Sequence, residues 1–67
     1  MKLKDFENVV FAQDTKVVVS WKFNEGVEWE AIKEYKKATN EEWWGWNYEV
    51  SWIGKSKNYD IVIHIRP

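Results

Sequence analysis

Residues 48–65, YEVSWIGKSKNYDIVIHI, decide the fold because two alternating apolar runs flank a polar turn. Every second side chain of a strand shares one face, so each run supplies one apolar face. A four-residue turn at 55–58 joins the runs, and a slip of one residue would expose the isoleucines to water. The register that follows pairs Trp52 with Ile61, Val50 with Ile63 and Tyr48 with Ile65.

Residues 16–23, KVVVSWKF, alternate in the same way and predict another strand. Asn24-Glu25-Gly26 predicts a three-residue hairpin loop with its glycine at a positive φ. A second strand at 27–31 would follow, pairing Phe23 with Val27, Trp21 with Trp29 and Val19 with Ala31. A helix that begins near Val27 is the competing interpretation, which propensity alone does not exclude.

Two helices complete the predicted order. Leu3, Phe6 and Val10 have helical spacing and predict a helix over 3–11, and Ile32 and Tyr35 form the inner face of another at 32–39. Residues 41–47 show no clean period. The predicted fold is a single α+β domain over residues 1–67 in the order α-β-β-α-β-β. Its four-stranded sheet is antiparallel, with the helices on one face, and the strand order stays open.

The chain is small and rich in large rings. Its 67 residues include six tryptophans, three tyrosines and three phenylalanines, and no cysteine. A domain of this size buries only about 60% of its unfolded surface, whereas each aromatic side chain can bury about 150–250 Å². Twelve aromatic residues exceed what this interior can enclose. We therefore expect some aromatic surface to face solvent or a partner.

Charge and hydropathy exclude several classes of function. Ten basic and eleven acidic residues give a net charge of −1, which argues against the strong basic field of a duplex-DNA binder. No apolar run approaches the roughly 20 residues that cross a bilayer. The start, Met1-Lys2-Leu3-Lys4-Asp5, has no signal-peptide pattern. We expect a cytoplasmic protein without membrane partners.

The sequence offers little for catalysis. His64 is the only histidine, and the predicted register places Glu49 opposite it, with Ser51 and Ser20 as the nearest candidate nucleophiles. A base and its orienting carboxylate need a site that excludes water, whereas these residues lie on an open strand face. A cross-strand charge pair, worth about 0.2–1 kcal/mol, explains the same residues. We expect no enzyme activity.

Metal and cofactor motifs are also missing. Without cysteine, only carboxylates and one histidine could bind a metal, and the nearest cluster has no calcium-loop spacing. That cluster is Glu25, Glu28, Glu30 and Glu34. Each of Gly26, Gly45 and Gly54 is isolated and is explained by a turn. The sequence therefore predicts no metal and no cofactor.

The segment Trp43-Trp44-Gly45-Trp46 is the unusual feature of the chain. Its three indoles cannot all point into one core, because neighbouring side chains diverge. Two interpretations stay open: two indoles close the core and the third is partly exposed, or at least one anchors a partner. The predicted partner-binding residues are Trp43, Trp44 and Trp46 with the flanking Glu41, Glu42 and Asn47.

Three ligand classes could use exposed indoles. A protein partner ranks first because tryptophan is enriched at interface hot spots. Single-stranded nucleic acid ranks second: bases stack on aromatic rings beside lysines, here Lys16, Lys22, Lys55 and Lys57. Carbohydrate ranks third, and self-association through an exposed tryptophan is a further alternative.

The chain also resembles a large group of short phage and prophage proteins from low-GC bacteria. Three stretches carry the resemblance: residues 1–6, MKLKDF; residues 14–19, DTKVVV; and residues 59–65, YDIVIHI. The tryptophans at 43–46 depart from the polar connection expected there. The resemblance implies the same α-β-β-α-β-β plan and a protein that binds and inhibits or modulates a host factor, such as a defence nuclease.

Overall fold

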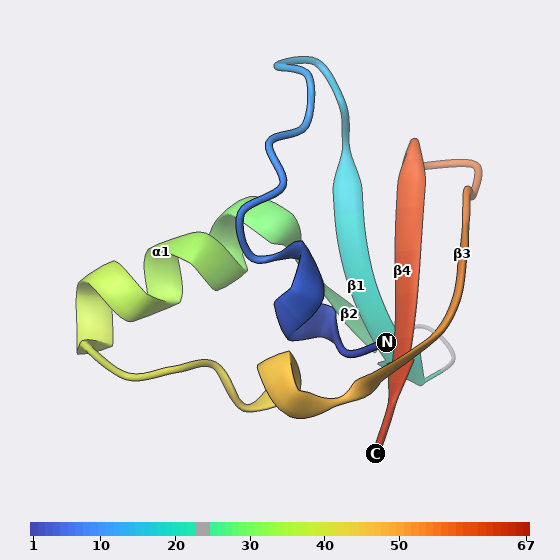
Figure 1. The fold of residues 1–67 in the computed structure, drawn as a ribbon. Coiled ribbons are helices and arrows are strands. Elements are labelled where there is room, and N and C mark those ends of the chain that lie inside the picture. Colours follow the sequence, from blue (N-terminus) through green and yellow to red (C-terminus); the bar gives the residue numbers. More distant parts are fainter. Residues whose placement is uncertain (23–24) are drawn as a thin grey trace.

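The computed structural model describes residues 1–22 and 25–67, and it is a small α+β fold with one α-helix and a four-stranded sheet. The helix and the two short 3-10 helices cover one face of the sheet and leave the other face open (Figure 1). The elements in chain order are η1 (Leu3–Phe6), β1 (Val17–Lys22), β2 (Glu25–Glu28), α1 (Trp29–Thr39), η2 (Trp44–Asn47), β3 (Glu49–Gly54) and β4 (Ile61–Arg66).

The sheet is mixed, so the predicted all-antiparallel sheet is wrong. Its order is β2-β1-β4-β3, and the central strands β1 and β4 run parallel, with Val17 opposite Ile61 and Val19 opposite Ile63. Each hairpin is antiparallel, as the sequence indicates. The connection through α1 decides the rest: it returns the chain along the sheet, as crossovers between parallel strands do. The strand after the helix, β3, therefore runs in the same direction as β2, and β4 runs in the same direction as β1.

The first hairpin is shorter than predicted. β2 ends at Glu28 and Val19 pairs with Val27, so the expected strand at 27–31 is wrong, as are its pairs of Trp21 with Trp29 and Val19 with Ala31. The competing prediction, a helix that begins near Val27, is closer to the structure. The helix α1 begins at Trp29 and buries Trp29 and Ile32. Gly26 lies within β2 and has no positive φ. The predicted roles of Phe23 and Asn24 fall outside the described residues.

The predicted helix over 3–11 is reduced to the single turn η1. The chain before it follows the edge of β3: Leu3 N donates to Tyr48 O at 3.0 Å, and Val50 N donates to Met1 O at 2.7 Å. These bonds pair the first residues of the chain with the edge strand β3 and hold the backbone extended up to Lys2. Beyond η1, Val10 is 93% exposed, so the helical apolar face expected there has no core to cover.

The second hairpin contains an irregularity that the sequence does not reveal. Val50 pairs with Ile65 and Trp52 with His64, and the register shifts between Val50 and Trp52. The predicted register, which put Val50 opposite Ile63 and Trp52 opposite Ile61, is wrong. A bulge adds one residue to one strand, and one residue reverses every later side chain. Trp52 therefore shares a face with His64, away from the core.

One aromatic and aliphatic core fills the space between the sheet and the helices. Leu3, Val19 and Ile65 are fully buried, and Ile32 and Ile63 nearly so. Trp29, Trp43 and Trp46 complete this core, whereas Tyr35, expected on the inner face of α1, is 37% exposed. Within the described residues, no helix has the length and apolar character needed to cross a membrane.

Candidate functional site

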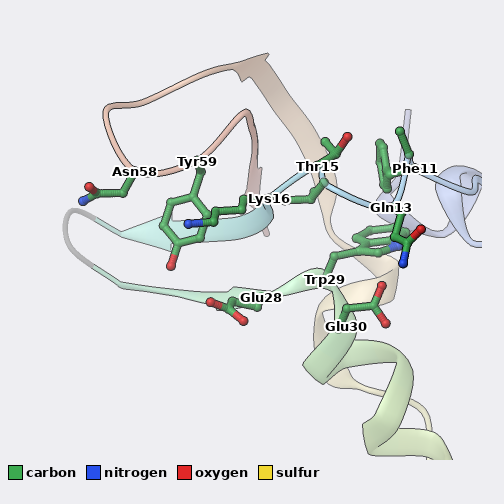
Figure 2. A pocket seen from close by; sticks show the side chains of 11 residues that line it. Phe11, Gln13, Thr15, Lys16, Glu28, Trp29, Glu30, Asn58 and Tyr59 are labelled. Carbon is green, nitrogen blue, oxygen red and sulfur yellow. The ribbon is translucent and has the colours of Figure 1, made fainter.

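A hollow of about 670 Å³ lies beside the start of α1, and none of the six predicted partner-binding residues lines it (Figure 2). Glu28 and Glu30 face it from one side and Lys16 from the other, with Phe11 and Trp29 behind them. Carboxylates at a helix N-terminus complement the helix dipole. The acidic side of this hollow therefore has a structural explanation, and the charges of both signs favour no ligand class.

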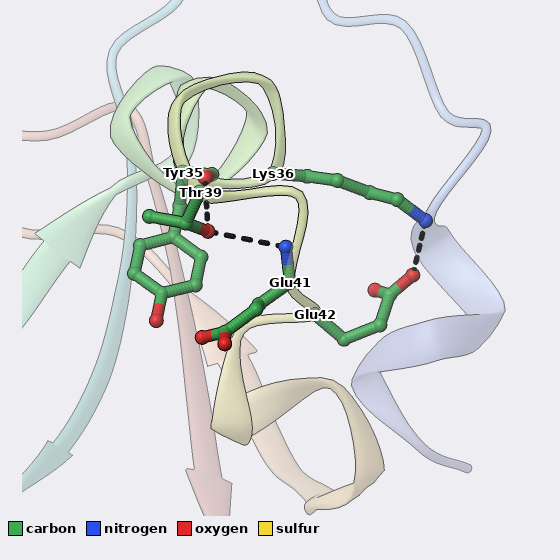
Figure 3. Close-up of polar contacts among 5 residues, drawn as sticks. All are labelled: Tyr35, Lys36, Thr39, Glu41 and Glu42. Atoms are coloured by element: carbon green, nitrogen blue, oxygen red, sulfur yellow. Dashed lines mark hydrogen bonds and ion pairs between the residues drawn. The ribbon is translucent and has the colours of Figure 1, made fainter.

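Capping interactions at the end of α1 fix the segment that carries the clustered tryptophans (Figure 3). Asn40 adopts the left-handed conformation at the C-cap and donates from its backbone N to Lys36 O at 2.7 Å. The Thr39 hydroxyl donates to Tyr35 O at 2.8 Å and accepts from Glu41 N at 3.2 Å. These bonds end the helix and set the direction of the chain toward Trp43.

An ion pair strengthens this connection. Lys36 Nζ lies 2.5 Å from Glu42 Oε1 (Figure 3). The hydrogen bond between the two side chains raises the pKa of Lys36 above its ordinary value and lowers that of Glu42. Both groups are exposed, so the pair orients the loop and contributes little to stability. A partner would therefore find Glu42 already paired.

The three clustered indoles differ in how much of each is exposed to solvent. Trp43 and Trp46 are 7% and 6% exposed, whereas Trp44 is 49% exposed. Trp46 packs edge-on against Trp29 at 5.7 Å between ring centroids, inside the core. This burial matches the interpretation in which two indoles close the core and the third is partly exposed. Only Trp44 of the three offers substantial indole surface to a partner.

Trp44 is held by three aromatic neighbours. Its ring centroid lies 4.9 Å from Trp21, 4.7 Å from Trp43 and 5.1 Å from Tyr48, with the Trp21 and Tyr48 contacts in edge geometry. Such pairs contribute about 0.5–1.5 kcal/mol each beyond burial. We call Trp21, Trp44 and Tyr48 the Trp44 rim. Trp21 and Tyr48 were not among the predicted partner-binding residues, because their proximity depends on the sheet and no local motif signals it.

Position 45 must be glycine because a side chain there would collide with the Trp43 ring. The predicted explanation, a turn that needs the conformational freedom of glycine, does not apply. Gly45 lies inside η2 and is buried, and no described glycine has a positive φ. A Cβ on Gly45 would lie 2.2–2.8 Å from three ring atoms of Trp43. The missing side chain lets the Trp43 indole lie against the backbone of η2, which seats that ring in the core.

The predicted opposition of His64 and Glu49 is wrong. Glu49 pairs with Arg66 in the sheet, and its carboxylate accepts from the Met1 amino group at 3.1 Å. His64 stacks on Trp52 instead, at 5.1 Å and 5° between the ring planes. Its Nδ1 atom is buried and has no hydrogen-bond partner in the described structure, so no described carboxylate holds the ring as the predicted pair would. His64 thus supports an indole.

The flanking polar residues lie on the surface, with Glu41, Glu42 and Asn47 all exposed. In the part of the chain that the structure describes, no cluster of three or more histidine or acidic side chains could hold a metal. Chemically, the arrangement offers a rigid apolar ring bordered by carboxylates and an amide, which suits non-covalent recognition.

No protein-family model, curated protein or solved structure matches this chain. The geometry of the Trp44 rim and of the sheet must therefore carry any functional conclusion.

Proposed function

We propose that this chain is a non-enzymatic protein-binding domain whose anchor is Trp44. The observation that carries the proposal is an indole that stays half exposed although three aromatic rings contact it. Tryptophan is enriched among the few residues that dominate binding energy at interfaces. Glu41 and Asn47 provide the polar border that such anchors have.

The rim supports the proposal because its anchor is ordered before binding. Ordering a free side chain costs about 0.5–1.5 kcal/mol on association. Trp44 is already oriented by Trp21, Trp43 and Tyr48, and the ion pair of Lys36 with Glu42 orients the loop that precedes it. The ordering cost at this position is therefore small.

The resemblance to short phage proteins supplies the proposed class of partner. It points to a host protein in the cytoplasm, including a defence nuclease, that the domain inhibits or modulates by covering a surface. The pairing of Glu49 with the Met1 amino group supports the non-enzymatic part of the proposal, because it removes the carboxylate that would orient His64 as a base.

Affinity capture from a lysate of the native host, followed by titration of the captured protein, tests the proposal. We expect Trp44→Ala to weaken that affinity at least about 30-fold, the loss of a 2 kcal/mol hot spot. Trp52→Ala is the matched control, because its indole is equally exposed on the opposite face. Equal weakening by both variants, or none by Trp44→Ala, would contradict the rim as the contact surface. Sedimentation of the pure protein separates self-association from binding to another protein.

A further inference from the structure

The open face of the sheet is hollowed into a groove of about 780 Å³, within the range of about 300–1,000 Å³ typical of ligand sites. It runs over all four strands and under the turn between β3 and β4. We call it the open-face groove, defined by Val18, Lys22, Trp52, Lys57, Val62 and His64. Among the described elements, no helix covers this side of the sheet (Figure 1).

The bulge in β3 places an indole in this groove. Without the register shift after Val50, Trp52 would lie on the core face with Val50. Bulges often redirect a side chain at a binding site. Here the redirected ring lies parallel to His64 at 5.1 Å and stays 50% exposed. Trp52 thus offers one flat face to a ligand while the imidazole supports the other.

The floor of the groove is apolar and sheltered. Val18 and Val62 are only 8% and 7% exposed although none of the described helices covers them. The surrounding side chains shelter them, and the rings of Trp52 and Tyr59 line the same groove. A buried apolar floor beside aromatic rings suits a flat ring that stacks and excludes water.

The charge in the groove differs from that of the whole chain. The net charge of the protein is −1, yet Lys22 and Lys57 line the groove and no described lining residue is acidic. Glu28, on the same face of the sheet, lines the other hollow and not this groove. An anionic ligand is therefore complementary to the open-face groove.

The turn that carries Lys57 is ordered before any ligand binds. Ser56 N donates to Tyr59 O at 3.1 Å, and Tyr59 N donates to the Ser56 hydroxyl at 3.2 Å. These reciprocal bonds fix Lys57 and Asn58 between them. The amide of Asn58 and the hydroxyl of Ser20 add polar groups to the same lining.

We propose that the open-face groove binds single-stranded nucleic acid. One base stacks on Trp52 above the valine floor, and Lys22 and Lys57 contact the adjacent phosphates. A flat ring joined to a phosphate matches this combination of exposed indole and lysines, and single strands are bound by such surfaces. The groove is open and extends across the sheet, which fits a chain that continues beyond it. A duplex hides its base faces, so it gains nothing from Trp52.

Fluorescence anisotropy with labelled single-stranded DNA and RNA of about ten nucleotides tests the proposal. We expect quenching of tryptophan fluorescence, and binding that weakens about sevenfold between 50 and 200 mM salt for two phosphate contacts. Trp52→Ala should weaken binding about 5- to 150-fold, the range for loss of one stacked base. Whichever of DNA or RNA binds more tightly identifies the natural strand.

Matched variants keep the result independent of folding and of the Trp44 rim. Lys22→Gln with Lys57→Gln should abolish most of the salt dependence, whereas Lys37→Gln, a lysine on α1, should not. Trp44→Ala should leave oligonucleotide binding unchanged, so failure of this inference and failure of the proposed protein binding give different patterns. Absence of binding at low salt overturns the inference. Equal binding of a duplex or of a mononucleotide also overturns it. A dimer of the pure protein that Trp52→Ala dissociates overturns it as well.

Discussion

Lys33 shows how a charged side chain contributes to an aromatic core. Its Nζ lies 5.3 Å from the Trp29 ring centroid and 5.8 Å from that of Trp46, and it donates to Glu7 O. The lysine thus links α1 to the backbone after η1 while its charge rests over two indoles. Cation–π contacts contribute about 0.5–2 kcal/mol, depending on desolvation.

Replacing Lys33 should therefore cost more than replacing another lysine of the same helix. We expect Lys33→Ala to lower the free energy of unfolding by about 1–3 kcal/mol, from the lost ring contacts and the hydrogen bond to Glu7. Lys37→Ala removes only an exposed ion pair and should change it by less than about 0.5 kcal/mol. Urea unfolding followed by circular dichroism measures both. Equal changes in the free energy of unfolding for the two variants would show that the ring contacts of Lys33 do not stabilise the fold.

The short helix η2 depends on one steric condition. Trp43 reaches the core only because Gly45 leaves room for its ring. We expect Gly45→Ala to destabilise the fold by about 1–3 kcal/mol, the usual cost of overpacking. Gly54→Ala is the control: its Cβ would lie 3.4 Å from the nearest ring atom of Trp52, and we expect a change below about 0.5 kcal/mol. Thermal unfolding of both variants tests this, and an unchanged Gly45→Ala would mean that Trp43 can shift without loss.

Local patterns predicted the elements better than their pairing. The strands Val17–Lys22 and Ile61–Arg66 and the end of α1 at Thr39 follow from periodicity and are confirmed. Burial does not alternate along the two strands, because Val18 and Val62 are buried as well. The bulge after Val50 has no sequence signature, since neither glycine nor proline marks it. Periodicity therefore assigned Trp52 to the core, whereas the structure places it in the open-face groove.

The order of the hairpins depends on the whole molecule, so no window of sequence could supply it. Leu3 and Trp43 lie far apart in the chain, and both are buried against the same sheet face. Once α1 carries the chain back across that face, the parallel pairing of β1 with β4 follows. The expectation of surplus aromatic surface was also a statement about the whole molecule, and the half-exposed Trp44 and Trp52 confirm it.

The division between buried and exposed indoles should appear directly in stability. A domain of this length has only about 3–10 kcal/mol of stability, and truncating a buried tryptophan to alanine costs about 3–5 kcal/mol. Trp46→Ala should therefore remove from about a third to all of this stability. Trp44→Ala removes a ring that is half in solvent, and we expect a loss of about 1.5–2 kcal/mol, the low end of the sum for its three aromatic contacts.

Circular dichroism of the two variants across a urea series distinguishes these outcomes. A Trp44→Ala variant that keeps most of its stability, beside a Trp46→Ala variant that loses clearly more, is the pattern that leaves Trp44 free to serve as an anchor. If Trp44→Ala unfolds as readily as Trp46→Ala, the Trp44 indole is a structural part of the core. Its partial exposure would then be a consequence of small size, and protein binding through the rim would lose its physical basis.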